Sequence, residues 1–179
     1  MMDARFCIVE DSREQNPLDF SAFDDCRVIR DELWPGDYSL RAMTNFAAVE
    51  RKSVADLVGT MKGGYAGFSA TTPKRFDREL KALRGYNIHG FTGFVIVEPD
   101  IVPGIQPLGA FEQIQNHTYR SMIPPDKVMA FVKRIRREWK VPVHFAKSRE
   151  HAAAIVHDKL KAEWRLRMFY KTVEEDVTP

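Results

Sequence analysis

Apolar and polar residues follow two periods along this chain, and the two periods predict its strands and helices. Short apolar runs that stop at charged residues are typical of buried strands, whereas apolar residues three or four positions apart indicate helices. The predicted strands span residues 6–10, 26–29, 38–42, 46–52, 91–97 and 141–145. The predicted helices span residues 53–62, a segment beginning at 72, 111–119, 124–139 and about 148–171, and a frayed acidic tail follows the last of them.

The order of these elements predicts an α/β fold in a single domain over residues 1–179. The first four strands suggest a small antiparallel core, with a turn at Pro35-Gly36-Asp37 that contains the residue types favoured in turns. In the second half strands alternate with helices, and this alternation implies a parallel or mixed sheet. We therefore expect a central mixed sheet flanked by helices on both faces.

Composition excludes several classes of protein. The chain is 44% hydrophobic, and no apolar run approaches the roughly 20 residues that a membrane helix needs. Its N-terminus carries acidic residues and lacks the apolar core of a signal peptide, so we expect an intracellular, cytoplasmic protein with no membrane partner. Cys7 and Cys26 have no CxxC neighbour, which favours small buried side chains over a disulfide or a zinc site.

Charge is distributed unevenly along the chain. Residues 1–50 hold 11 acidic and 5 basic residues, a net charge of −6, and residues 51–179 hold 14 acidic and 22 basic residues, a net charge of +8. An acidic cluster set against a basic remainder fits a metal site beside a polyanion-binding surface, although charge runs more often line solvated faces. The clearest basic run lies near the end of the predicted helix at 124–139, and its members would share one helical face: Lys133, Arg136, Arg137 and Lys140. This face would either bind successive phosphates of a nucleic acid or simply face solvent.

The charged end of the fourth strand carries the strongest chemical signal. Residues two apart in a strand point to the same face, so Glu50 and Lys52 project together and Arg51 projects oppositely. A hairpin with the strand that follows Asp37 would bring that carboxylate to the same end of the sheet. Two acids and a lysine in this order indicate a nuclease-type site, in which the carboxylates hold a cation such as Mg²⁺ and the lysine supplies positive charge at the phosphate.

Further motifs surround this triplet. They are Gly36-Asp37, Glu50-Arg51-Lys52 with Asp56 after three further positions, Asp11-Ser12-Arg13-Glu14, RFDREL at 75–80 and FVIVE at 94–98. With these motifs the chain resembles the XPF-type nuclease domain of structure-specific endonucleases, whose core motif is GD…ERKxxxD. The resemblance covers roughly residues 6–160 and implies a restriction-endonuclease-like α/β core.

The resemblance also implies a function and a set of site residues. It implies Mg²⁺- or Mn²⁺-dependent cleavage of branched or flap DNA, in repair or recombination. The implied catalytic residues are Asp37, Glu50, Arg51 and Lys52. The implied metal ligands are Asp37 and Glu50, with Asp11 and Asp56 as accessory acids in or beside the metal site. The arginines that would contact phosphate or brace the carboxylates are Arg51, Arg13 and Arg75.

Two features of the chain depart from this family or allow another interpretation. Asp56 could instead cap the helix that begins after Ser53, because an acid in the first turn is favoured there. The spacing between GD and ERK is stretched by RAMTN at 41–45, which we interpret as a longer hairpin loop.

Family members usually carry a tandem helix-hairpin-helix domain, and 179 residues leave no room for one, as in a minimal domain from a phage or bacterial genome. The grip on DNA would then come from the nuclease domain, a homodimer or a protein partner. The alternative function is a non-catalytic DNA-binding scaffold that retains the nuclease fold.

Overall fold

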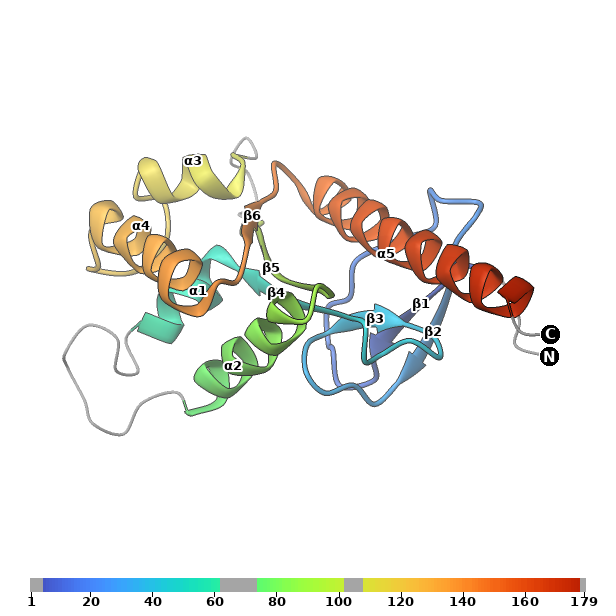
Figure 1. Ribbon diagram of the computed structural model, residues 1–179. Helices are drawn as coiled ribbons and strands as arrows, with labels where there is room; N and C mark the ends of the chain where they lie inside the picture. Colours follow the sequence, from blue (N-terminus) through green and yellow to red (C-terminus); the bar gives the residue numbers. More distant parts are fainter. Residues whose placement is uncertain (1–4, 62–73, 102–107, 178–179) are drawn as a thin grey trace.

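A six-stranded sheet forms the centre of the computed structural model, which describes residues 5–61, 74–101 and 108–177 (Figure 1). The strands are β1 (Cys7–Asp11), β2 (Arg27–Asp31), β3 (Tyr38–Leu40), β4 (Ala47–Ser53), β5 (Thr92–Glu98) and β6 (Val143–Phe145). The helices are α1 (Val54–Thr60), α2 (Lys74–Ile88), α3 (Ala110–Gln115), α4 (Pro125–Arg134), the π-helical turn η2 (Ile135–Trp139) and α5 (Arg149–Val177). None of the helices in these ranges is both long enough and apolar enough to cross a bilayer.

The sheet is mixed, as the sequence predicts. Its strand order is β2-β1-β3-β4-β5-β6. β3 runs antiparallel to both of its neighbours, β1 and β4, whereas β4, β5 and β6 are parallel to one another. The antiparallel core near the N-terminus is therefore present, but β2 joins it parallel to β1. Pairing therefore changes between parallel and antiparallel at two strands, β1 and β4.

Helices cover both faces of the sheet, and the alternation of side chains along β5 separates two hydrophobic cores. Val95 and Val97 pack with residues of α1, α2, α3 and α4, while Phe94 and Ile96 pack with residues of α5. Figure 1 shows the same division, with α5 along one part of the sheet and α1 to α4 gathered on the other. The alternation continues to the end of β4, where it sorts the charged residues onto two faces.

The second predicted strand differs from expectation. It spans Arg27–Asp31 rather than 26–29, and its side chains are mostly exposed, because β2 lies at the edge of the sheet with β1 as its only neighbour. Cys26 precedes this strand and is only partly buried, whereas Cys7 in β1 is buried as predicted. Neither cysteine forms a disulfide in the structure.

Several helix boundaries also differ from the prediction. α3 ends at Gln115 rather than near 119, and the long helix from 124 changes to a π-helical turn after Arg134. Lys140 then adopts a left-handed conformation with φ 56°, which ends the helix. α5 begins as predicted after Ser148, whose Oγ accepts the His151 N–H at 3.1 Å, but its backbone stays helical to Val177. The predicted start of α2 at Thr72 and the predicted end of α1 at 62 lie outside the described residues.

Candidate active site

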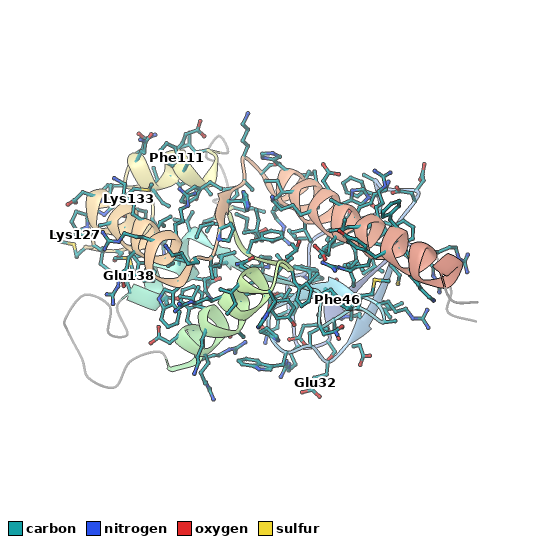
Figure 2. The ribbon with its side chains drawn as sticks, viewed as in Figure 1. Glu32, Phe46, Phe111, Lys127, Lys133 and Glu138 are labelled. Atoms are coloured by element: carbon teal, nitrogen blue, oxygen red, sulfur yellow. The ribbon has the colours of Figure 1, made fainter. Side chains whose placement is uncertain are left out.

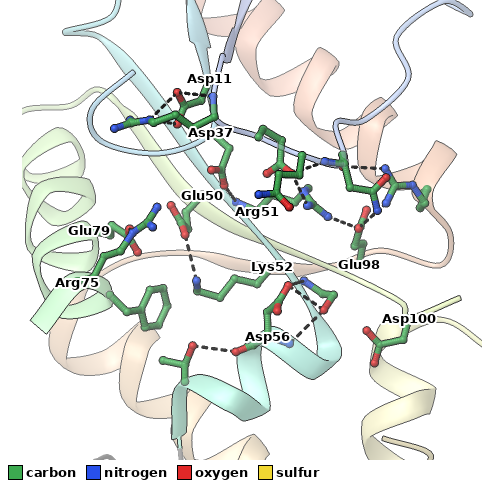
Figure 3. Close-up of a pocket in the computed structure, with 18 of the residues that line it drawn as sticks. Asp11, Asp37, Glu50, Arg51, Lys52, Asp56, Arg75, Glu79, Glu98 and Asp100 are labelled. Carbon is green, nitrogen blue, oxygen red and sulfur yellow. Dashed lines mark hydrogen bonds and ion pairs between the residues drawn. The ribbon is translucent and has the colours of Figure 1, made fainter. Parts of the chain in front are cut away.

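The end of β4 places Glu50 and Lys52 together on one face of the sheet. They follow Ala48 in the alternation, so they lie on the side covered by α1 and α2. The Lys52 Nζ donates to Glu50 Oε1 at 3.1 Å and lies 4.3 Å from the centroid of the Phe76 ring on α2. A pocket opens at this point, and its lining comes from β1, β4, β5, α1, α2 and the turn that carries Asp37. Figure 3 shows Glu50 and Lys52 facing this pocket, with Asp37 beside Glu50. The lysine is therefore held between a carboxylate and an aromatic face.

Gly36 brings Asp37 close to the end of β4. Its φ of +85° is a conformation that glycine adopts readily, and a Cβ built there would lie 2.6 Å from the Val49 carbonyl oxygen. This close approach lets the Asp37 N–H donate to Val49 O at 2.7 Å. The Asp37 Oδ2 then accepts the Arg51 backbone N–H at 2.7 Å. Two backbone contacts with β4 thus position the first carboxylate, and both involve neighbours of Glu50.

Asp37 and Glu50 form an acidic pair beside Lys52, in which Glu50 is buried and Asp37 is half-buried. Burial raises the pKa of Asp37 to about 6, although the hydrogen bond from the Arg51 backbone opposes the rise. Burial also raises the pKa of Glu50, to about 8, and the charge of Asp37 adds to the rise while Lys52 lowers it. The charge of Lys52 therefore lowers the pKa of both carboxyl groups by less than burial raises it. A divalent cation between them would supply the missing positive charge.

The donor set fits a hard cation bound by few protein ligands. Among residues 5–61, 74–101 and 108–177, no group of three or more acidic, histidine or cysteine side chains encloses a metal position. Mg²⁺ commonly binds proteins through one or two carboxylates and keeps several waters, and Mn²⁺ accepts the same oxygen ligands. Asp37 and Glu50 meet that requirement, so Mg²⁺ or Mn²⁺ fits the residues that are present.

The two accessory acids have other partners in the structure. Asp11 is buried at the end of β1, and both of its carboxylate oxygens accept from Arg13 Nε at 3.1 Å. Asp56 forms a capping box with Ser53, whose Oγ donates to Asp56 Oδ2 at 3.0 Å and accepts the Asp56 N–H at 3.1 Å. Both residues line the pocket, but hydrogen bonding at the end of a strand and at the start of a helix accounts for their placement.

Arg51 points to the opposite face of the sheet and enters a buried ion-pair cluster. Its Nη2 donates to Glu14 at 2.9 Å, and its Nη1 donates to Glu98 at the end of β5. Glu98 also accepts from Arg149 Nη1 at 2.9 Å, and Arg149 Nη2 donates to the Pro17 carbonyl at 2.7 Å. The Arg51 side chain is 9% exposed and the Glu98 side chain 3%. This arrangement suits an arginine that braces the loop after β1 against the ends of β4 and β5.

Two of the basic residues that the sequence predicts for the site, Arg13 and Arg75, line the pocket and are exposed. Their side chains are 55% and 74% exposed, and both residues line the pocket. Each is anchored by a buried carboxylate, Arg13 by Asp11 and Arg75 by Glu79, whose Oε1 accepts from Arg75 Nε at 2.7 Å. Anchoring fixes the direction of each guanidinium. Arg13 also donates from Nη1 to Glu32 and from Nη2 to the Leu33 carbonyl, so only its second N–H on each of these nitrogens can reach a phosphate.

The predicted basic face of the fourth helix is less regular than expected. Lys133 lies at the end of α4, on its exposed side (Figure 2), but the π-helical turn that follows changes the spacing of Arg136 and Arg137. Arg136 Nη2 donates to the Val143 carbonyl, and Lys140 lies beyond the helix. These basic residues remain exposed, although they no longer share one helical face and do not line the pocket.

Comparison with known protein families places these residues in a family. A profile of the ERCC4 domain matches residues 10–158, which is most of the chain. The chain belongs to the ERCC4 domain family. The match includes every residue of the pocket that the sequence predicts, from Asp11 to Arg75. A comparison of this ERCC4 domain with curated protein sequences gives no match.

Solved structures of XPF from Aeropyrum pernix have a similar fold. One of them matches the ERCC4 domain described here with a TM-score of 0.57 and 18% identity, over 87% of this chain and 60% of that chain. XPF from Aeropyrum pernix in complex with DNA matches with a TM-score of 0.54 and 16% identity, over 92% of this chain and 66% of that chain. The chain thus spans less than two thirds of the XPF chain in each case. These likenesses confirm the restriction-endonuclease-like α/β fold and the XPF-type resemblance.

The structure adds pocket residues of the ERCC4 domain to which the sequence pattern assigned no role. They are Glu14, Trp34, Glu79, Glu98, Asp100 and Arg149. Glu79 has a recognisable signal, because it occupies an apolar position of α2 between buried Phe76 and Leu83. Glu98 ends β5 directly after the apolar run at 94–97, and this position also marks it. Arg149 joins the cluster from a distant part of the chain, and no local pattern predicts that contact.

Proposed function

We propose that this ERCC4 domain is a divalent-metal-dependent DNA endonuclease that hydrolyses phosphodiester bonds at branched or flap DNA. The observation that carries the proposal is the Asp37–Glu50 pair at β4, which lines the pocket beside Lys52 and in which burial raises the pKa of both carboxyl groups. Membership of the ERCC4 domain family supports the reaction class, and the likeness to an XPF structure solved with DNA supports the substrate. A role in DNA repair or recombination follows from such a substrate.

In this proposal each side chain of the pocket has a separate task. Asp37 and Glu50 would hold a Mg²⁺ or Mn²⁺ ion, which would supply Lewis acidity toward the phosphate and toward a bound water. Lys52 presents its ammonium group to the charge that develops on the phosphate oxygens. The Glu50 hydrogen bond and the Phe76 ring hold that ammonium in place. Arg51 acts from the other face of β4, as a positioning residue that keeps the strand end fixed.

The remaining acids and basic residues act around this centre. Asp11 orients Arg13, and Asp56 caps α1 at the point where the chain leaves Lys52. Direct metal coordination by Asp11 or Asp56 stays a prediction. Arg13 and Arg75 contact phosphates at the mouth of the pocket, and the exposed basic residues between 133 and 140 extend the phosphate contacts further along the DNA. A homodimer or a protein partner would add to this grip.

Cleavage assays with purified variants test the proposal. Labelled flap, fork, junction and linear DNA are incubated with Mg²⁺ or Mn²⁺, and the wild type is compared with Lys52→Ala and with Asp37→Asn combined with Glu50→Gln. Lys127→Ala is the matched control, because Lys127 is an exposed lysine on α4 outside the pocket. We expect the active-site variants to lose at least about 100-fold in rate with little change in fold, and the control to match the wild type. A wild type that cleaves none of these substrates with either metal would overturn the proposal.

One observation favours a second candidate, a non-catalytic DNA-binding scaffold. The two predicted accessory acids, Asp11 and Asp56, are hydrogen-bonded to Arg13 and Ser53, so fewer carboxylates remain for a cation than the sequence predicts. Calorimetric titration with Mn²⁺ separates the two candidates. A nuclease site binds the ion, and Asp37→Asn with Glu50→Gln abolishes the binding heat, whereas a scaffold gives the same trace before and after the substitutions.

A further inference from the structure

Trp34 is a large aromatic residue exposed at the pocket that contains Asp37 and Glu50. Its residue surface is 58% exposed, and it lines the pocket. Its neighbours Leu33 and Pro35 are both buried. Within the part of the chain that the structure describes, no hydrogen bond or ring contact engages the indole. An apolar side chain of this size, left in water beside the proposed phosphate site, is available to a ligand.

The backbone that carries Trp34 is fixed on both sides. The Leu33 carbonyl accepts from Arg13 Nη2 at 2.5 Å, and the Leu33 N–H donates to Asp11 at 3.5 Å. On the other side, Gly36 packs directly against the Val49 carbonyl. The same contacts that position Asp37 therefore also hold Trp34 at the pocket. An aromatic ring on a fixed segment loses little conformational freedom when it binds.

Two guanidinium groups accompany the indole. Arg13 and Arg75 are both exposed at the pocket, and they lie near enough for their charges to interact. Each is anchored by a buried carboxylate, as described above. An aromatic ring beside fixed positive charges is the combination that single-stranded nucleic acid recognises, because its bases stack on the ring while its phosphates bind the cations.

We propose that Trp34 stacks on an unpaired base of the DNA strand whose phosphate enters the pocket, while Arg13 and Arg75 contact the adjacent phosphates. The inference rests on the proposed function and names the local form of its substrate. A base inside a duplex has both faces covered by its neighbours, so only an unpaired or displaced base offers a free face to the indole. The site would therefore select a nucleotide at a junction, flap or other single-stranded position.

Binding measurements test this stacking independently of cleavage. Two fluorescently labelled strands of equal length and equal phosphate number are used, one an oligothymidylate and the other an abasic-spacer strand. Affinities are measured by anisotropy in chelator, so that neither strand is cut. The proteins are the wild type, Trp34→Ala, Trp34→Phe and Tyr170→Ala. Tyr170 is the matched control, because it is an exposed aromatic near Phe46, at the end of β4 away from the site.

The expected result is a loss that depends on the bases. Trp34→Ala should weaken binding of the oligothymidylate roughly 5- to 100-fold and change binding of the spacer strand less than about twofold. Trp34→Phe should retain most of the affinity, and Tyr170→Ala should match the wild type on both strands. Equal losses on the two strands, or no loss on either, would overturn the inference.

Cleavage by the same preparations is measured separately with Mn²⁺. Base-dependent binding without cleavage would support the stacking of Trp34 and overturn the proposed nuclease activity. Cleavage without base-dependent binding would support the nuclease activity and overturn the stacking.

Discussion

Replacing Gly36 with alanine tests how the acidic pair is assembled. The added Cβ would lie 2.6 Å from Val49 O, 3.0 Å from Val49 C and 3.2 Å from Val49 N. These are backbone atoms of a central strand, so they cannot move aside as the end of a flexible side chain could. The turn that carries Asp37 must therefore move away from β4, and the 2.7 Å hydrogen bond from Asp37 N to Val49 O must lengthen or break.

The expected cost of Gly36→Ala has two parts. A left-handed conformation costs a residue with a Cβ about 1–2 kcal/mol. Overpacking against a fixed neighbour costs about 1–3 kcal/mol. The free energy of unfolding should therefore fall by about 2–5 kcal/mol, a large share of the roughly 5–15 kcal/mol typical of a folded protein. The displaced Asp37 should also weaken Mn²⁺ binding.

A second glycine provides the control. Gly90 also has a positive φ, +74°, but a Cβ built there meets no atom within 4 Å. Gly90→Ala should therefore lower the free energy of unfolding only by the cost of the left-handed conformation. Replacing glycine with alanine also reduces the conformational entropy of the unfolded chain, but it does so equally in both variants. Urea denaturation gives both free energies, and calorimetry gives the Mn²⁺ affinity. Variants that agree within about 0.5 kcal/mol would show that the contact with Val49 does not constrain the site.

Three further predictions concern stability and charge. In chelator, the free energy of unfolding should fall as pH rises from about 4 to about 8, because the folded protein keeps protons on Asp37 and Glu50 that the unfolded chain releases at lower pH. Asp37→Asn with Glu50→Gln should flatten this fall in urea titrations at each pH, and an unchanged slope would contradict the assignment. Arg51→Ala should lower the free energy of unfolding by about 3–5 kcal/mol, as measured by urea denaturation, because the substitution leaves Glu98 buried without one of its partners. A variant that loses DNA affinity but keeps normal stability would instead place Arg51 at the phosphate. Gly85→Ala in α2 should raise the free energy of unfolding by about 0.5–1 kcal/mol, measured by thermal or urea unfolding, because alanine favours a helix and its methyl group meets no atom within 4 Å. A destabilised variant would show that the helix needs glycine at this position.

The elements with a strong apolar period were predictable from the sequence. β1, β4 and β5 are apolar runs that end in charge, and their burial follows from that pattern. β2 was harder, because RVIRD carries the composition of a strand but not the information that it lies at an edge. The change from α4 to the π-helical turn was not predictable, because helical periodicity does not distinguish the two kinds of turn over five residues.

The site was predictable where it depends on alternation within one strand. The side-by-side placement of Glu50 and Lys52, and the opposite direction of Arg51, follow from β geometry alone. The partners of Arg51 depend on tertiary packing between the loop after β1, β5 and α5. Trp34 was also missed, because one aromatic residue before a turn carries no signal of exposure until the buried residues around it are known.

The hairpin between β3 and β4 has a consequence for recognising distant relatives. Asp37 precedes β3 and Glu50 lies near the end of β4, so the connection at 41–46 closes the hairpin at the end away from both carboxylates. Insertions or deletions in that connection would change the spacing of the two motif halves without moving the acids. One residue gained or lost within 47–50 would instead exchange the faces of Glu50 and Arg51. Relatives should therefore be aligned so that each residue of the ERK segment keeps its face of the strand, and insertions or deletions should be allowed in the connection at 41–46.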